Sequence, residues 1–312
     1  MMDLAKVSNL RKMVFMTFQE IIFALYGNTG REWFNALPTL LERYAQRWDL
    51  TLEFPFENLS YNYVAPARCA DGTSAVLKVG FPNDELRAEI AALRHFDGQG
   101  MVRLLKADEE NCVFLMERIF PGKTLWNAGD EESTMHILDV MPKLWKPYFG
   151  DYLFKRVDDW GLAFSRLRER YDGGTGNLDA HLVTKAENLF FELLSSSDES
   201  VLLHGDLHHD NVLSAERQSY LAIDPKGVLG EPCYEVGAFL RNPLPALLQK
   251  ENPRALMQRR VDMVVEGLGF DRKRVLGWGM SQAVLSAIWC DEDGVDCAQG
   301  MMKVAEVMES IQ

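Results

Sequence analysis

The spacing of hydrophobic and polar residues changes along the chain, and each spacing predicts a different kind of secondary structure. From Val7 to Tyr26, and again from Arg31 to Asp49, apolar residues recur with the spacing of amphipathic helices. The polar run Gly27–Gly30 is expected to end the first helix. From Leu52 to Glu117, short apolar runs between turn residues predict mainly strands, and helical spacing returns after Pro121-Gly122.

The strand-rich region contains a lysine in an apolar setting. Tyr61–Ala67 and Ser74–Val79 flank Asp71-Gly72, a sequence typical of a hairpin turn. Lys78 is the only cation of the second predicted strand. Because a buried ammonium without a partner is costly, we expect a carboxylate beside it.

A helix predicted over Asp84–Phe96, with Asn83 as its N-cap, offers that carboxylate. Glu85 and Glu89 share one face of this helix, and we favour Glu89 as the partner of Lys78. The alternative is that Lys78 extends to solvent from an edge strand and that the two glutamates form a solvated face.

The most informative stretch runs from Val201 to Asp224. Two short strands, Val201–Leu203 and Tyr220–Ile223, enclose a polar loop that contains Asp206 and Asn211, and Asp224 follows the second strand. Carboxylate and amide oxygens are the ligands that Mg²⁺ prefers, and Mg²⁺ shares its ligation with phosphate. The alternative is that Asp206 and Asn211 are ordinary turn residues.

Histidines in this loop raise a second metal hypothesis. His204 and His208 stand four residues apart, which on a helix would suit zinc. Gly205 and the preceding strand instead indicate a loop, so we interpret His204 as a brace and His208 and His209 as loop side chains.

Composition narrows the classes of function. The formal net charge of −13 argues against nucleic acid or an anionic membrane as partner and suits a cationic small molecule. Five cysteines without a C-x-x-C pair predict reduced thiols and a cytoplasmic protein. The apolar run at Met13–Tyr26 is interrupted by Gln19 and Glu20, so no membrane span or signal peptide is expected. We expect a monomer or weak dimer.

The motif His204-Gly205-Asp206-x-x-x-x-Asn211, with Asp224 after a hairpin, resembles the aminoglycoside phosphotransferases of the protein-kinase-like fold. Further matching pieces, such as Met116–Gly122 and Asp224–Gly227, resemble the aminoglycoside and hydroxyurea resistance kinases of the streptomycin type. The resemblance implies that Asp206 accepts the proton of the substrate hydroxyl and that Asn211 and Asp224 hold Mg²⁺. It also implies that Lys78, paired with Glu89, grips the phosphates of ATP.

Other nucleotide contacts follow from the same resemblance. The chain lacks the G-x-G-x-x-G loop of protein kinases before Lys78, so the backbone of Tyr61 and Asn62 is expected to touch the phosphates. Backbone groups of Glu117 and Ile119 are expected to face adenine. Only ten residues separate Asp224 from Glu235, too few for the activation segment of a protein kinase, so the substrate is expected to be small.

Together these features predict an α+β, bilobal protein-kinase-like fold. Residues 1–118 would form the nucleotide-binding lobe, with helices in 1–50 and the antiparallel sheet and Lys/Glu helix in 51–118, and residues 119–312 a mainly helical catalytic lobe. The expected activity is ATP-dependent phosphorylation of a hydroxyl on a cationic aminoglycoside of the streptomycin type. Candidate carboxylates for that substrate are Glu231, Glu235, Asp291 and Glu292, unless residues 291–296 form a solvated turn.

Three alternatives remain beside this prediction. One is a kinase of hydroxyurea or of a non-antibiotic metabolite, because the fold does not fix the acceptor. The others are a pseudokinase and a protein kinase.

Overall fold

The computed structural model describes residues 17–57, 59–197 and 200–311. The chain divides into two compact units, residues 1–98 with 102–119, and residues 99–101 with 120–312. The predicted boundary between residues 118 and 119 falls next to this division. Each unit is described by itself below.

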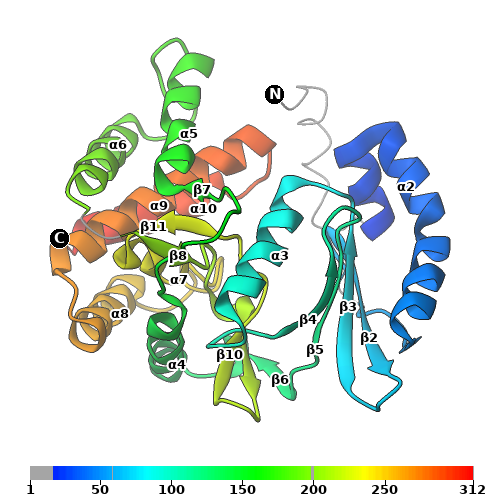
Figure 1. The fold of residues 1–312 in the computed structure, drawn as a ribbon. Helices are drawn as coiled ribbons and strands as arrows, with labels where there is room; N and C mark the ends of the chain where they lie inside the picture. Colours follow the sequence, from blue (N-terminus) through cyan, green and yellow to red (C-terminus); the bar gives the residue numbers. More distant parts are fainter. Residues whose placement is uncertain (1–16, 58, 198–199, 312) are drawn as a thin grey trace. The chain divides into compact units, whose positions relative to one another are not determined.

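The first unit is a five-stranded antiparallel sheet with a long helix on each face (Figure 1). The strand order is β1-β2-β3-β5-β4. The elements are α2 (Phe18–Trp48), β1 (Leu50–Leu52), β2 (Asn62–Cys69), β3 (Ser74–Gly80), α3 (Asp84–Phe96), β4 (Leu104–Asp108) and β5 (Val113–Glu117).

Side-chain alternation divides the two faces of this sheet. Leu77 and Val79 of β3 pack into the core beneath α2, together with Tyr44 and Trp48 of that helix. Because neighbouring side chains of a strand point to opposite faces, Lys78 between them points to the α3 face. One apolar strand can therefore carry a cation without placing it in the main core.

The N-terminal helices follow the prediction. The backbone at Gly27 (φ 58°, ψ −131°) is not helical, and it divides the segment Phe18–Trp48 into two helices at the predicted Gly27–Gly30 run. The second helix folds back on the first, since the ring centroids of Phe18 and Phe34 lie 5.7 Å apart. The beginning of the first predicted helix, before Thr17, lies outside the described residues.

Other predictions for this unit are confirmed. The Asp71-Gly72 turn joins β2 to β3, with Gly72 at φ 86° and the Asp71 carboxylate accepting from the Thr73 N–H at 2.9 Å. Helix α3 spans the predicted residues, and the Asn83 side chain caps it by accepting from the Leu86 N–H at 2.9 Å.

The second unit is mainly helical, with two small three-stranded sheets ordered β10-β9-β6 and β7-β11-β8. Its helices are α4 (Asp130–Leu144), α5 (Val157–Arg170), α6 (Ala180–Ser195), α7 (Val236–Leu240), α8 (Pro253–Leu268), α9 (Arg272–Asp293) and α10 (Ala298–Ser310), with 3₁₀ turns η2 (Leu125–Asn127), η3 (His209–Asn211) and η4 (Pro232–Glu235). Its strands are β6 (Pro121–Thr124), β7 (Lys155–Arg156), β8 (Val201–Leu203), β9 (Val212–Ala215), β10 (Tyr220–Ala222) and β11 (Val228–Gly230).

Helix α9 is the centre of this unit. Every residue from Val275 to Ile288 is buried, so the helix is enclosed on all sides rather than along one stripe. Within it, Gln282 is a buried polar side chain, 5% exposed. A polar group in that setting requires a hydrogen-bond partner.

A disulfide joins the end of α9 to the start of α10 and corrects one prediction. Cys290 and Cys297 are bonded, whereas Cys69, Cys112 and Cys233 are free thiols. Gly294 at φ 67° ends α9 and turns the chain back, which brings the two cysteine Cα atoms to 5.8 Å. The prediction of five reduced thiols is therefore wrong for this pair.

Within the described part of the chain, no helix combines the length and apolar character needed to cross a membrane.

Candidate active site

The loop that carries Asp206 begins with a glycine that no other residue can replace without strain. β8 leads into His204-Gly205-Asp206, and Gly205 has φ +84°. A Cβ at this position would lie 2.9 Å from the Trp160 ring and 3.1 Å from a Val228 methyl. The tight turn and the close packing together require glycine.

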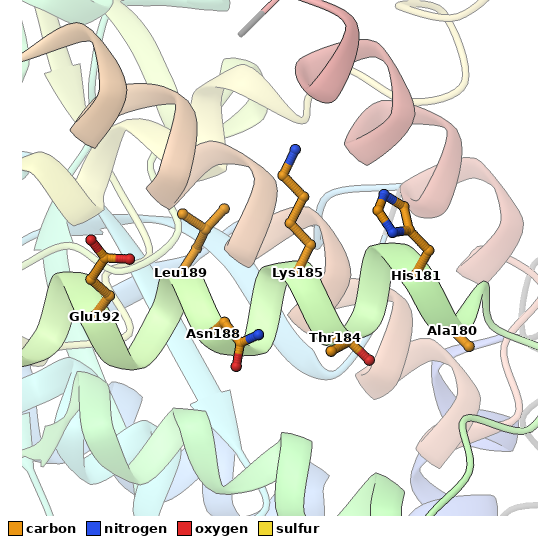
Figure 2. A pocket seen from close by; sticks show the side chains of 7 residues that line it. All are labelled: Ala180, His181, Thr184, Lys185, Asn188, Leu189 and Glu192. Carbon is orange, nitrogen blue, oxygen red and sulfur yellow. The ribbon is translucent and has the colours of Figure 1, made fainter.

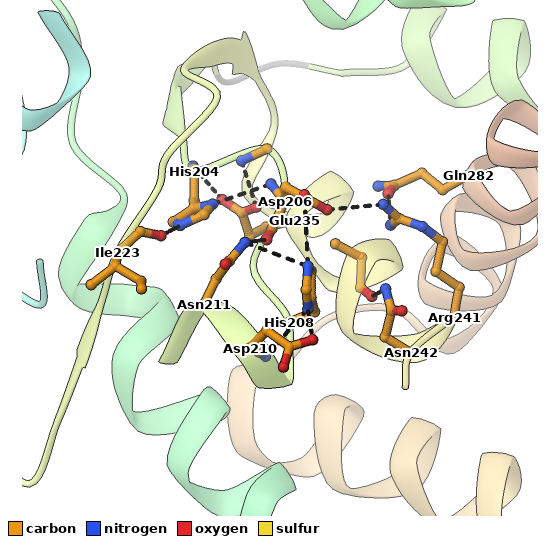
Figure 3. Close-up of polar contacts among 12 residues, drawn as sticks. His204, Asp206, His208, Asp210, Asn211, Ile223, Glu235, Arg241, Asn242 and Gln282 are labelled. Carbon is orange, nitrogen blue, oxygen red and sulfur yellow. Dashed lines mark hydrogen bonds and ion pairs between the residues drawn. The ribbon is translucent and has the colours of Figure 1, made fainter. Parts of the chain in front are cut away.

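His204 braces this loop, as predicted. Its Nε2 lies 2.7 Å from the Ile223 carbonyl oxygen, and its Nδ1 accepts from the Asp206 N–H at 3.2 Å (Figure 3). Burial lowers the pKa of His204 to about 4. The ring is therefore neutral and carries its proton on Nε2, where it donates to the carbonyl.

Glu235 anchors the same turn through two hydrogen bonds to its backbone. Its Oε2 accepts from the His204 N–H at 2.6 Å and its Oε1 from the Gly205 N–H at 2.9 Å. The side chain is only 1% exposed, and burial raises its pKa to about 7 against the opposing effect of these two hydrogen bonds. The expectation that Glu235 faces a substrate is corrected, since both its oxygens are occupied by the loop backbone.

Asp206 projects from this turn with its carboxylate partly exposed. Oδ1 lies 3.1 Å from Arg241 Nη2, and Oδ2 lies 3.7 Å from His208 Nε2. Partial burial would raise its pKa, but the contact with His208 and the charges of His208, Arg241 and Lys226 hold the pKa well below its usual range. Asp206 is thus an ionised hydrogen-bond acceptor at neutral pH.

The two predicted metal ligands are joined through the backbone. The Ile223 N–H donates to the Asn211 carbonyl oxygen at 3.0 Å, which places Asp224, the next residue, beside Asn211. Asn211 Nδ2 donates to the Asp206 carbonyl oxygen at 2.9 Å, so its amide oxygen is the end left for a cation. An amide oxygen and a carboxylate fit the hard-oxygen preference of Mg²⁺.

Lys78 and Glu89 form the predicted ion pair in the sheet unit. Lys78 Nζ lies 2.7 Å from Oε1 and 2.9 Å from Oε2 of Glu89, and the residues are 4% and 7% exposed. Glu85 is exposed on the same helix. The preference for Glu89 over Glu85 is confirmed, and the alternative in which Lys78 extends to solvent is excluded.

The other predicted nucleotide contacts lie at strand ends of the same unit. Tyr61 is 53% exposed and precedes β2, whereas Asn62 begins that strand with its side chain against Gly80. Glu117 ends β5, and its N–H donates to the Arg103 carbonyl oxygen at 3.0 Å. The backbone groups of Glu117, and of Ile119 at the end of the unit, stay the predicted contacts for adenine.

The remaining predicted substrate carboxylates have partners within the protein. Glu231 pairs with Arg274 at 2.7 Å and accepts from the indole N–H of Trp278. Glu292 pairs with Arg166 at 2.8 Å. These interactions tie helices of the second unit to one another or to the chain before η4.

Asp291 is similarly engaged. It lies 3.2 Å from Arg170 Nη1 and 3.0 Å from the Tyr171 hydroxyl. The solvated-turn alternative for residues 291–296 is only partly right, because Asp291 and Glu292 belong to the last turn of α9 and bind α5 and its C-terminal end.

Two residues of the loop surroundings were not predicted, Arg241 and Gln282. Arg241 contacts Asp206, and Gln282 accepts from Arg241 (Figure 3). A signal for Gln282 exists in the sequence, since it is a long polar side chain inside the apolar run of α9. Arg241 has no comparable signal, because its partners lie 35 and 41 residues away.

A hollow of about 630 Å³ runs along α6 in the same unit (Figure 2). All its lining residues belong to that helix, among them His181, Lys185 and Glu192. His181 and Lys185 bind Glu309 of α10 at 2.9 and 3.0 Å. None of the predicted site residues lines it. Among the described residues, no group of three His, Cys, Asp or Glu side chains is placed to hold a metal ion.

A sheet unit with a buried Lys–Glu pair, and a helical unit whose loop presents Asp206 and Asn211 with Asp224 after a hairpin, are the features of a phosphotransferase of the protein-kinase-like fold. Solved structures share this α+β fold. Aminoglycoside phosphotransferase APH(4)-Ia, in ternary complex with ADP and hygromycin B, aligns with a TM-score of 0.60 at 14% identity over 86% of this chain and 96% of that chain. Choline kinase LicA from Streptococcus pneumoniae aligns with a TM-score of 0.60 at 12% identity over 88% and 99%.

Sequence comparison identifies the family. The profile of the aminoglycoside/hydroxyurea antibiotic resistance kinases matches residues 47–294, and the chain belongs to that family. It is 31% identical to streptomycin 6-kinase of Streptomyces griseus over 90% of this chain and 92% of the relative. It is 30% identical to hydroxyurea phosphotransferase of Kitasatospora aureofaciens over 90% and 82%. The protein is thus an enzyme that transfers phosphate to an alcohol group of a small molecule.

Proposed function

We propose that the protein phosphorylates a hydroxyl of a streptomycin-type aminoglycoside with ATP, and that Asp206 is the base. The observation that carries this proposal is the partly exposed Asp206 carboxylate on a turn fixed from three sides, by His204, Glu235 and Asn211. An acceptor hydroxyl needs a hydrogen-bond acceptor that is already deprotonated and held in place.

Asn211 and Asp224 are the residues that would hold Mg²⁺. When bound, Mg²⁺ neutralises charge on the transferred phosphate. The chain itself contributes the placement, since the bond from the Ile223 N–H to the Asn211 carbonyl oxygen joins the two backbone segments, and Asn211 Nδ2 donates to the Asp206 carbonyl oxygen.

Lys78 is proposed to bind the α and β phosphates, with Glu89 fixing its ammonium group. The backbone of Tyr61 and Asn62 is proposed to lie over the phosphates. The Glu117 carbonyl and the Ile119 N–H are proposed to bind adenine.

An aromatic pair supports a cationic acceptor. Trp160 lies against Gly205, the residue before Asp206, and its ring meets that of Trp289 edge to face at 5.7 Å between centroids. Both tryptophans are half-buried. An indole face beside the base can bind a guanidinium or ammonium group.

The test is a mass-spectrometric assay with purified protein, ATP, Mg²⁺ and either streptomycin or hydroxyurea. We expect one phosphate group to be added to streptomycin. Addition to hydroxyurea alone would favour the second acceptor, which the match to hydroxyurea phosphotransferase supports. The absence of transfer to either compound would contradict the proposed substrate class.

The role of Asp206 is tested by Asp206→Ala. We expect kcat to fall by about 10²–10⁴-fold, the usual contribution of a general base, while ATP binding stays close to that of the wild type. Turnover by the variant at the wild-type rate would refute the assignment of Asp206 as the base.

A further inference from the structure

Arg241 connects the candidate base to the central helix of its unit. It follows the last residue of α7, is 8% exposed, and directs its guanidinium between two acceptors (Figure 3). Nη2 donates to Asp206 Oδ1 at 3.1 Å, and Nη1 donates to Gln282 Oε1 at 3.1 Å. A planar guanidinium can serve both acceptors at once, which a single ammonium group cannot do with the same geometry.

Gln282 is itself fixed. Its Nε2 donates to the Tyr234 carbonyl oxygen, so the orientation of its amide is set and its Oε1 is presented to Arg241. Its side chain packs directly against Gly237, where even a Cβ atom would collide with the amide. A rigid, fully buried helix thus holds Gln282, and Gln282 holds the guanidinium.

This arrangement makes the two oxygens of Asp206 unequal. Oδ1 is bound to Arg241, whereas Oδ2 lies 3.7 Å from His208 Nε2, beyond hydrogen-bond distance. Oδ2 is consequently the oxygen with capacity for an acceptor hydroxyl. The bond at Oδ1 favours one orientation of the carboxylate, because rotation of the side chain would break it.

Charge supports the same conclusion. Asp206 ionises close to Glu235, a second carboxylate, and a phosphate group must approach it during the proposed reaction. The guanidinium compensates negative charge on the side of Asp206 that faces α9, and leaves the other oxygen as an acceptor.

We propose that Arg241, oriented by Gln282, is a positioning residue that directs Asp206 Oδ2 toward the acceptor hydroxyl. This inference rests on the proposed role of Asp206 as base. Arg241 acts through Asp206 and does not itself contact the acceptor.

The test is a double-mutant cycle with Arg241→Ala, Asp206→Asn and the double variant. Rates are measured with ATP and two acceptors, streptomycin and, in its absence, water. We expect Arg241→Ala to lower kcat by about 10²-fold, the effect of misplacing a reacting group, with the KM for ATP within about threefold of wild type. In the Asp206→Asn background the same substitution should have no further effect.

Two further variants and a rescue experiment separate positioning from structural support. Gln282→Leu should lower kcat by about tenfold, because the guanidinium keeps its charge but loses its orientation. Added guanidinium chloride should restore part of the activity of Arg241→Ala and none of that of Asp206→Asn. Arg168→Ala is the matched control, since Arg168 also joins two helices through an ion pair, to Glu187 at 2.7 Å, and should leave kcat unchanged.

Two outcomes would overturn the inference. One is wild-type kcat in Arg241→Ala while Asp206→Asn is inactive, which leaves the proposed function intact. The other is an Arg241→Ala effect of equal size in both backgrounds, which indicates structural support alone. Wild-type activity in Asp206→Asn would instead overturn the proposed function.

Discussion

Glu89 in the sheet unit and Glu235 in the helical unit are both buried carboxylates, 7% and 1% exposed, yet their charges are compensated in different ways. Glu89 meets a full positive charge, the ammonium of Lys78 at 2.7 Å. Glu235 meets two backbone N–H groups, those of His204 and Gly205. A charge–charge pair leaves an uncompensated ion when one member is removed, whereas a carboxylate bound to N–H groups leaves two neutral donors.

Lys78→Met gives the largest expected effect on stability. It leaves the Glu89 carboxylate buried without its ammonium, and we expect the free energy of unfolding to fall by about 3–5 kcal/mol. Urea denaturation measures it. The double variant Lys78→Met with Glu89→Leu should recover most of the loss, and Glu85→Gln on the exposed face should change stability by less than about 0.5 kcal/mol. If the free energy of unfolding of Lys78→Met falls by less than about 1 kcal/mol, the charge–charge pair of Lys78 and Glu89 is no more sensitive to substitution than the hydrogen bonds of Glu235.

Glu235→Gln is expected to have a smaller effect that depends on pH. Near pH 5 Glu235 is a neutral carboxylic acid whose two oxygens can both still accept, whereas the amide nitrogen of glutamine cannot, so the variant leaves one backbone N–H without an acceptor at a cost of about 1–3 kcal/mol. The pKa of Glu235 is about 7 in the folded protein and 4.5 ordinarily, so the folded state binds more protons between these values. Its contribution to stability is therefore present below pH 4.5 and is lost as pH rises toward 7.

The measurement compares the unfolding free energies of wild type and Glu235→Gln from pH 5 to pH 7.5. Their difference should shrink with rising pH by at most about 1.4 kcal/mol per pH unit. The charged groups that face Glu235 are His204, Asp206 and Arg241. The pKa values of His204 and Asp206 are lowered to below this pH range, so we assign the slope to Glu235. A difference that stays constant with pH would contradict this account.

Asn83→Ala gives the smallest expected effect and tests backbone capping at the surface. The Asn83 side chain accepts from the Leu86 N–H at the start of α3, the helix that carries Glu89. We expect a loss of about 1 kcal/mol in thermal or urea unfolding. Asn83→Asp keeps the accepting oxygen but loses the Nδ2 donor to the Tyr26 hydroxyl and the Phe81 carbonyl oxygen, so it should retain only part of that stability. Equal losses in both variants would assign the effect to these donors and not to the cap.

The same contrast explains what the sequence could predict. Lys78 and Glu89 are found because both are charged, lie eleven residues apart, and occupy a strand and a helix whose periodicities are readable. The roles of the loop residues Asp206, Asn211 and Asp224 stay predictions, and they could be made because the spacing of the three residues matches a known motif.

The role of Glu235 in anchoring the loop could not be predicted from the sequence, for a physical reason. Glu235 binds backbone N–H groups, which every residue but proline has, so nothing in the sequence of residues 204–205 reveals the partner. Arg241 is missed because it reaches Asp206 only through tertiary packing. The Cys290–Cys297 bond is missed because an odd number of cysteines does not show which of them the turn at Gly294 brings together.

Because Glu235 accepts hydrogen bonds from backbone N–H groups, its contacts with the loop do not depend on which side chains the loop carries. His208, which is half-buried, and Asp210, which is exposed, can then be randomised in a directed-evolution library for new acceptors while the turn that supports Asp206 stays anchored. In enzyme engineering, the backbone of this loop would be kept and its exposed side chains would be varied.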